Sequence, residues 1–131
     1  MHGDKMKKTV QLQYKSIFKY KDHHETVQYQ AKGTYLKDEK KEQLSFYHDD
    51  QKIEITIRGQ DVTLVHGPSL LSLSYHRRLF NHYATPYGMI ELYGELVSLH
   101  HDRNIQMKYV LSDESEIISE VYLLIRYEEI S

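Results

Sequence analysis

Cysteine and tryptophan are absent from this chain of 131 residues, and proline and glycine are scarce, with two and six occurrences. Without cysteine there can be no disulfide framework, no zinc–thiolate site and no cysteine nucleophile. Apolar runs long enough to span a bilayer as a helix, about 18 residues, are also missing. The N-terminus lacks the apolar core of a secretory signal. We therefore expect a cytoplasmic protein whose translation starts at Met1 or Met6.

A strong excess of charge of one sign is lacking too. The formal net charge is −2 and the isoelectric point is near 6.5, so the chain has no general attraction to nucleic acid or to an anionic membrane. Lys15, Lys19 and Lys21 fall on one face of a predicted strand, whereas Tyr14 and Phe18 fall on the other. Lysines on the face opposite the aromatic rings indicate a solvated outer surface rather than a single-strand binding site. We expect neither a nucleic-acid partner nor a membrane partner.

Tyrosine is abundant, with 12 residues, and apolar and polar side chains alternate along much of the chain. Tyrosine favours strands, and a period of two residues is typical of a strand with one buried face. Between residues 9 and 21, one face would carry Val10, Leu12, Tyr14, Ser16, Phe18 and Tyr20. Similar alternation predicts strands around residues 9–21, 25–36, 44–46, 53–57, 62–64, 69–83, 89–99, 105–111 and 117–127.

These segments predict an all-β fold in a single domain over residues 1–131, with residues 1–8 as a flexible N-terminal segment. About eight or nine antiparallel strands with short connections form either an up-and-down barrel or a sandwich. Several strands are long, which favours the barrel, and a barrel of about eight strands has room for a filled interior or one small ligand. We predict residues 69–83 as one long bent strand with a helical turn near residues 77–82, and a bulge or bend at Gly94.

Residues 85–88, Thr-Pro-Tyr-Gly, carry the chemistry of a turn. Pro86 fixes its own φ and holds Thr85 in an extended conformation. Proline at the second position and Gly88 at the fourth match a type I turn, so the segment is predicted to be a hairpin corner. Tyr83 and Tyr87 flank this corner, which would place them at the mouth of a barrel.

The region around this corner also carries a family resemblance. The matching positions are Gly67, Phe80, Tyr83, Thr85, Pro86, Tyr87 and Gly88, together with a glycine–aromatic strand, charged hairpin and aromatic strand over residues 33–48. On these residues the chain resembles the YwiB-like proteins, a bacterial family with no agreed activity. The likeness runs from about residue 9 onward and departs from the family at His66, where an arginine is usual nearby. The resemblance implies a lipocalin-like (calycin) β-barrel and implies nothing about chemistry.

Motifs for metal binding and catalysis are missing. No two of the nine histidines are separated by two to five residues, so neither a strand pair nor a helix pair of metal ligands is present. The chain has no Gly-x-Ser-x-Gly elbow and no phosphate-binding glycine loop. Its acidic residues gather in predicted turns rather than in buried pairs. We expect no metal, no cofactor and no enzymatic activity, with hydrolysis as the least favoured alternative.

The tyrosines predicted to face inward are the best functional lead. A buried tyrosine hydroxyl needs a partner, and around a cavity such hydroxyls could contact a small apolar or amphipathic ligand. The alternative is that the rings simply fill the barrel. The chain lacks the Arg-x-Tyr carboxylate clamp of fatty-acid carriers, because Arg126 is adjacent to Tyr127. The candidate ligand-binding residues are Tyr14, Tyr29, Tyr35, Tyr75, Tyr83, Tyr87 and Tyr109.

A second hypothesis is a protein-interaction module or a homo-oligomer without a ligand. Ile17, Tyr122 and Leu124 are apolar residues at positions predicted to face outward. Together they could form a surface patch for another protein or for a second copy of the chain.

Overall fold

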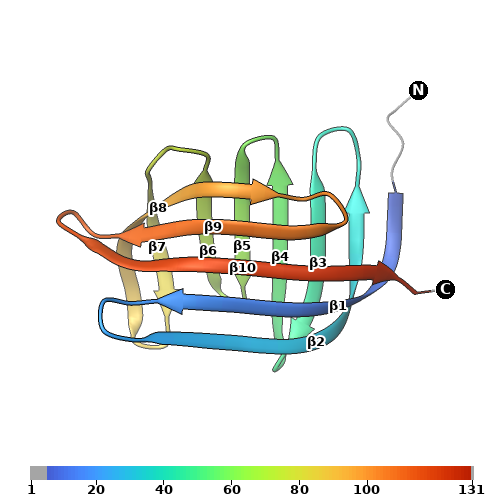
Figure 1. Ribbon diagram of the computed structural model, residues 1–131, viewed down its shortest axis with the longest axis horizontal. Helices are drawn as coiled ribbons and strands as arrows, with labels where there is room; N and C mark the ends of the chain where they lie inside the picture. The colour runs from blue at the N-terminus through green and yellow to red at the C-terminus, as the bar shows by residue number, and fades with distance from the viewer. Residues whose placement is uncertain (1–5, 131) are drawn as a thin grey trace.

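The computed structural model describes residues 6–130, which form ten strands and no helix (Figure 1). No segment within this range is therefore a helix that could cross a membrane. The strands are β1 (Met6–Lys19), β2 (His24–Lys37), β3 (Glu42–His48), β4 (Gln51–Arg58), β5 (Asp61–His66), β6 (Ser69–Ser74), β7 (Leu79–Thr85), β8 (Gly88–His100), β9 (Asn104–Ser112) and β10 (Ile117–Glu129).

All ten strands belong to one sheet in the order β6-β5-β4-β3-β2-β1-β10-β9-β8-β7. Strands that are consecutive in the chain are neighbours in the sheet, except β6 and β7, which form its two edges. The first and last strands, β1 and β10, also pair with each other. Figure 1 shows β1, β2, β8, β9 and β10 crossing in front of β3 to β7. The sheet therefore curls over itself, and the predicted all-β, antiparallel up-and-down barrel is confirmed, with ten strands rather than eight or nine.

Side chains close the barrel between its two edge strands, β6 and β7. The buried Asn81 on β7 accepts a hydrogen bond from the Ser72 N–H at 2.8 Å and donates to the Ser72 carbonyl at 3.0 Å. Ser69 Oγ donates to the Ala84 carbonyl at 2.6 Å. The Asn81 amide thus acts as a backbone group would in a strand ladder, because it offers one donor and one acceptor to the same residue.

The core lies between the two crossing halves of the sheet and consists of the inward side chains that alternation predicts. Val10, Leu12, Leu44, Leu96 and Ile125 are among the most deeply buried. Gly33 on β2 lies close against β3, since a Cβ atom there would clash with the Ser45 carbonyl oxygen. The absence of a side chain lets β3 approach β2 closely at this position.

The predicted single strand over residues 69–83 is wrong, because the chain breaks into β6 and β7. Between them, the Tyr75 N–H donates to the Gln60 carbonyl and the His76 N–H donates to the Leu96 carbonyl. The segment leaves the edge next to β5 and crosses to β8, with His76 at φ 56°. The helical turn predicted near residues 77–82 is therefore replaced by the start of β7.

Two smaller expectations also change. Residues 6–8 pair with β2, so the predicted flexible segment does not extend to them, while residues 1–5 lie outside the described residues. Gly94 pairs regularly with Leu79 and Leu111, and the irregularity in β8 falls between Leu96 and Ser98. A Cβ atom at Gly94 would come within 2.7 Å of the Leu73 side chain, so packing, not a bulge, explains this glycine.

Candidate functional site

A cavity of about 410 Å³ lies inside the barrel, in the size range of small-molecule sites. It sits toward the end that carries the β1–β2, β3–β4, β5–β6, β7–β8 and β9–β10 turns, which we call the β1–β2 end. Val27, Ile90 and Ile118 line it and are each at least 40% exposed, so the cavity reaches solvent at this end. Side chains from all ten strands contribute to its lining.

One wall of the cavity is aromatic. The rings of Tyr14 and Tyr29 stack with centroids 4.5 Å apart, and Tyr29 stacks in turn on His48 at 3.6 Å. These three residues come from β1, β2 and β3. The backbone pairing of β2 with β3 ends at Gly33 and Phe46, so the stack bridges a part of the wall that hydrogen bonds do not close.

The facing wall is aliphatic. It carries inward side chains of β4, β5 and β6, chiefly Ile53, Ile55, Leu64 and Leu71, and Leu92 of β8 adds a further aliphatic group to the lining. A molecule between the two walls would contact ring faces on one side and branched chains on the other. Burial of such apolar surface is the main favourable contribution that this cavity offers to binding.

Two hydroxyls in the cavity have no hydrogen-bond partner. Ser16 on β1 is 1% exposed and Ser119 on β10 is 2% exposed, and the Oγ atom of each is buried and unpaired among the described residues. The Ser16 hydroxyl lies close enough to Tyr14 to affect the pKa of that phenol, but outside hydrogen-bond geometry. Buried polar groups are nearly always paired, so both hydroxyls are informative exceptions.

The cavity phenols are held in their neutral form. Desolvation by burial raises the pKa of Tyr14, Tyr29 and Tyr109 above the ordinary tyrosine value. The neighbouring phenols raise the pKa values further, because an ionised ring beside a second ring that could ionise is disfavoured. These side chains therefore remain hydrogen-bond donors over the whole physiological pH range.

Charge is confined to the rim. No Lys, Arg, Asp or Glu is among the described residues that line the cavity. The turns at the β1–β2 end, residues 20–23, 49–50, 67–68, 86–87 and 113–116, carry six acidic side chains and one lysine. The potential around the mouth is therefore negative, which disfavours the entry of anions.

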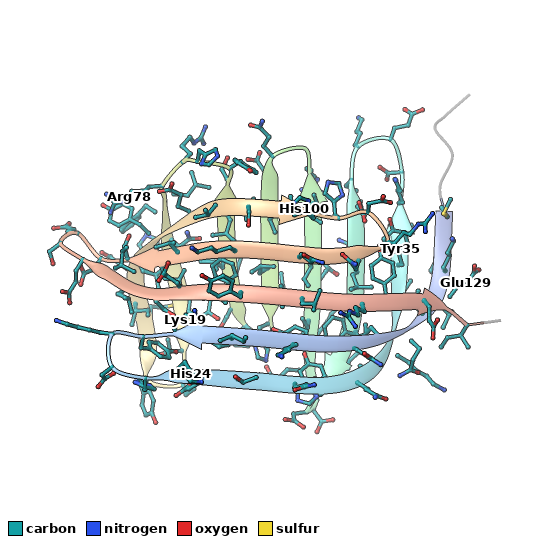
Figure 2. The ribbon with its side chains drawn as sticks, viewed as in Figure 1. Lys19, His24, Tyr35, Arg78, His100 and Glu129 are labelled. Carbon is teal, nitrogen blue, oxygen red and sulfur yellow. The ribbon has the colours of Figure 1, made fainter. Side chains whose placement is uncertain are left out.

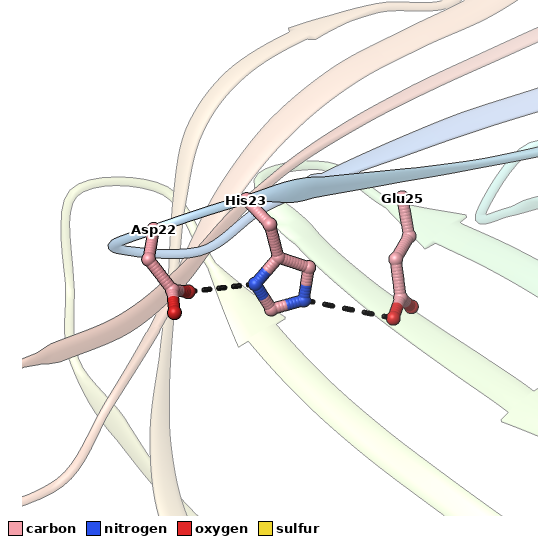
Figure 3. Close-up of polar contacts among 3 residues, drawn as sticks. All are labelled: Asp22, His23 and Glu25. Atoms are coloured by element: carbon pink, nitrogen blue, oxygen red, sulfur yellow. Dashed lines mark hydrogen bonds and ion pairs between the residues drawn. The ribbon is translucent and has the colours of Figure 1, made fainter.

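One of these turns holds an exposed histidine between two carboxylates (Figure 3). His23 Nδ1 lies 2.7 Å from Asp22, and His23 Nε2 lies 3.7 Å from Glu25. The hydrogen bond with Asp22 raises the pKa of His23 and lowers the pKa of Asp22. The imidazole also stacks on Tyr20, which lines the cavity, so this cluster orients a residue at the mouth.

Four of the seven predicted ligand-binding tyrosines line the cavity, namely Tyr14, Tyr29, Tyr83 and Tyr109. The other three lie elsewhere. Tyr35 packs at the opposite end, as Figure 2 shows by its place near Glu129 and away from Lys19 and His24. Tyr75 packs beside His76 at the corner between β6 and β7. Tyr87 is 99% exposed on the β7–β8 turn and points into solvent.

Alternation alone did not single out several lining residues. Ser16 stands on the predicted inward face, and its polarity in an apolar pattern was the available signal. His48 lies next to the turn Asp49–Asp50, and no pattern in the sequence marks it as a lining residue. Ile117 is in phase with the buried residues Ser119 and Val121 but is exposed, because an irregular pairing between Ile117 and Ser119 shifts the alternation there. Ile118 lines the cavity instead.

A second polar cluster lies at the other end of the barrel. The buried Glu42 on β3 contacts His101 Nδ1 at 2.7 Å, and its second oxygen, Oε1, has no partner among the described residues. The rings of Tyr35 and Tyr127 stack beside it, and burial followed by the nearby carboxylate raises the pKa of both phenols. The cluster ties the turn after β8 to the start of β3. Residues 6–130 bring no three His, Asp or Glu side chains together as metal ligands.

Comparison with known proteins supports the fold. No protein-family model matches the chain, and no curated protein matches it significantly. The structure is similar to the crystal structure of the YwiB protein from Bacillus subtilis, with a TM-score of 0.74, 16% sequence identity, and coverage of 95% of this chain and 94% of that chain. The resemblance to YwiB noted in the sequence is thus confirmed as a shared fold. At this level of identity the match carries no activity or ligand.

Proposed function

We propose that this protein binds a small, largely apolar molecule in the barrel cavity and acts as a binding protein rather than as an enzyme. The observation that carries the proposal is a solvent-connected cavity of about 410 Å³ to which all ten strands contribute lining side chains. A filled barrel would have no such space, because protein interiors pack without voids of this size.

The composition of the lining favours binding over catalysis. Its polar groups are serine and tyrosine hydroxyls and the two histidines His48 and His66, and no carboxylate lines the cavity. His48 Nε2 lies 3.4 Å from Asp49, an exposed carboxylate of the β3–β4 turn, so this carboxylate belongs to the rim and not to the cavity wall. Ser16 and Ser119 have no base in hydrogen-bond contact, and His48 is stacked on Tyr29. Nucleophilic catalysis needs a nucleophile and a base within bonding reach, and acid–base catalysis needs a positioned proton donor.

A cavity-filling substitution tests the proposal. Leu64→Trp adds a large ring to the aliphatic wall, whereas Leu70→Trp adds the same ring on the outer face of β6, where Leu70 is exposed. We expect the Leu70 variant to retain binding of apolar fluorescent probes and of any metabolite that raises the melting temperature of the wild type. The Leu64 variant should fold and lose this binding. Equal binding by both variants would place the ligand outside the barrel.

A second candidate function, a protein-interaction module or homo-oligomer, rests on the edge of β2. Residues 24–32 pair with β1 on one side, but β3 pairs with β2 only from Gly33 onward. An unpaired edge can accept another strand. Ile17, Tyr122 and Leu124 also lie together on the outer face of β1 and β10, half-buried beside lysines. A monomeric mass at all concentrations, with no partner in cross-linking, would remove this candidate.

A further inference from the structure

Ser16 and Ser119 lie at two different depths of the same cavity. Ser16 is opposite Leu123 in the β1–β10 ladder, four residues along β10 from Ser119. At the rise of a strand this separates the two positions by roughly 13 Å along the barrel wall. Ser119 is the nearer of the two to the β9–β10 turn, so it stands close to the mouth and Ser16 stands deep.

Both hydroxyls are left unpaired, although an apolar residue could stand at either position. Alanine or valine would fill these inward positions without a buried, unpaired oxygen. Each serine is surrounded by apolar inward side chains on its own strand, Phe18 for Ser16 and Val121 for Ser119. The pair therefore offers two unpaired hydroxyls at different depths of a cavity whose other polar lining groups are tyrosine hydroxyls and the imidazoles of His48 and His66.

The ligand cannot readily carry a charge. No described lining residue is a lysine, arginine, aspartate or glutamate, so an ion in the cavity would have no counter-ion. The acidic turns at the β1–β2 end add repulsion for a carboxylate at the mouth. Arg78 donates to the Asp113 carbonyl at the exposed β9–β10 turn and does not line the cavity. These features argue against a fatty acid or another organic anion.

We propose that the cavity selects an uncharged, elongated molecule with an apolar body and a hydroxyl or carbonyl oxygen at each end, one bonded to Ser16 and the other to Ser119. This inference rests on the proposed binding function and adds the class of ligand to it. The competing explanation is that solvent alone pairs with the two hydroxyls, in which case a ligand gains nothing from them.

A series of probes with one ring system separates these explanations. 4,4′-Biphenol carries a hydroxyl at each end, 4-phenylphenol carries one, biphenyl carries none, and biphenyl-4-carboxylate carries a charge. We expect affinity by titration calorimetry or fluorescence displacement to fall in that order. Each hydroxyl that finds its serine should improve affinity roughly three- to tenfold, the range of a net hydrogen bond.

Substitutions assign the effect to the two serines. Ser16→Ala and Ser119→Ala should each weaken 4,4′-biphenol roughly three- to tenfold and leave biphenyl unchanged. Ser45→Ala, on the outer side of β3 where the hydroxyl donates to Glu54, is the matched control and should change neither. Biphenyl and 4,4′-biphenol binding with equal affinity, or a carboxylate binding best, would overturn the inference and leave the binding function standing. Failure of all four probes to bind the wild type would overturn both.

Discussion

The ring of Tyr29 lies flat against the imidazole of His48, with centroids 3.6 Å apart and 4° between the planes. Tyr29 belongs to β2 and His48 to β3, and the two strands are no longer hydrogen-bonded at this level. The stack continues to Tyr14 on β1. An aromatic contact therefore holds the wall of the barrel together beside the cavity, where a strand ladder would otherwise be needed.

Removing this contact should loosen the wall locally. Tyr29→Ala loses two stacked partners and should lower the free energy of unfolding by about 2 kcal/mol, less than a fully buried ring because Tyr29 is only half-buried. Tyr29→Phe keeps the stack and should stay close to the wild type. Urea unfolding measures the free energy, and hydrogen exchange in residues 24–32 should rise only in the alanine variant. Unchanged exchange would show that the stack does not hold β2 in place.

Asn81 should be essential for closure of the barrel between β6 and β7. Asn81→Ala leaves the N–H and carbonyl of Ser72 without their partners, so the free energy of unfolding should fall by about 2–3 kcal/mol. His82→Ala, an exposed position on the same strand, is the control and should have a small effect. Amide exchange at Ser72 reports the broken bond directly. Slow exchange at Ser72 in the Asn81 variant would mean that backbone pairing replaces the side chain.

Ser16→Ala should make the protein without ligand more stable. The substitution removes a buried hydroxyl that has no hydrogen-bond partner, and this should raise the free energy of unfolding by about 1 kcal/mol. The same variant is expected to bind 4,4′-biphenol more weakly, so stability and affinity should change in opposite directions. A loss of stability in urea unfolding would show that Ser16 has a structural partner, and the role given to it in binding would then fail.

The β7–β8 turn separates backbone effects from side-chain effects. Gly88 has φ 118°, and a Cβ atom there would meet nothing within 4 Å, so Gly88→Ala should destabilise by about 1–3 kcal/mol through backbone strain alone. Tyr87 is fully exposed, so Tyr87→Phe should leave both stability and binding unchanged. Thermal unfolding of the two variants checks this. The opposite pattern would give Tyr87 a functional role.

Alternation predicted most of the fold because each inward face is a local property of its strand. Tyr14, Tyr29, Tyr83 and Tyr109 reach the cavity for this reason. The sequence could not predict the closure by Asn81, because only the folded barrel shows that β6 and β7 become neighbours. The role of His48 depends in the same way on the distance between β2 and β3.

Irregular pairing limited the prediction at the strand ends. The shift between Ile117 and Ser119 changes which residue faces inward only at the start of β10, and nothing in the local pattern of apolar residues signals it. Tyr35 was predicted on the correct face but at the wrong depth, because alternation gives the face of a residue and not the end of the barrel at which it lies.

The buried phenols should make stability fall at alkaline pH. Tyr109 has a raised pKa, chiefly through desolvation, with further contributions from Tyr14 and Tyr83. The folded state therefore keeps a proton that the unfolded chain releases near the ordinary tyrosine pKa of about 10. The stability linked to this proton is complete below that pH and is lost as the pH rises toward the folded pKa.

Urea midpoints between pH 8 and pH 11 should fall, and the fall should be shallower in Tyr109→Phe than in the wild type. Absorbance of tyrosinate should rise in two stages, with the buried rings ionising only on unfolding. An identical slope in Tyr109→Phe and the wild type would mean that solvent reaches Tyr109, and that the inner part of the cavity is wet rather than apolar.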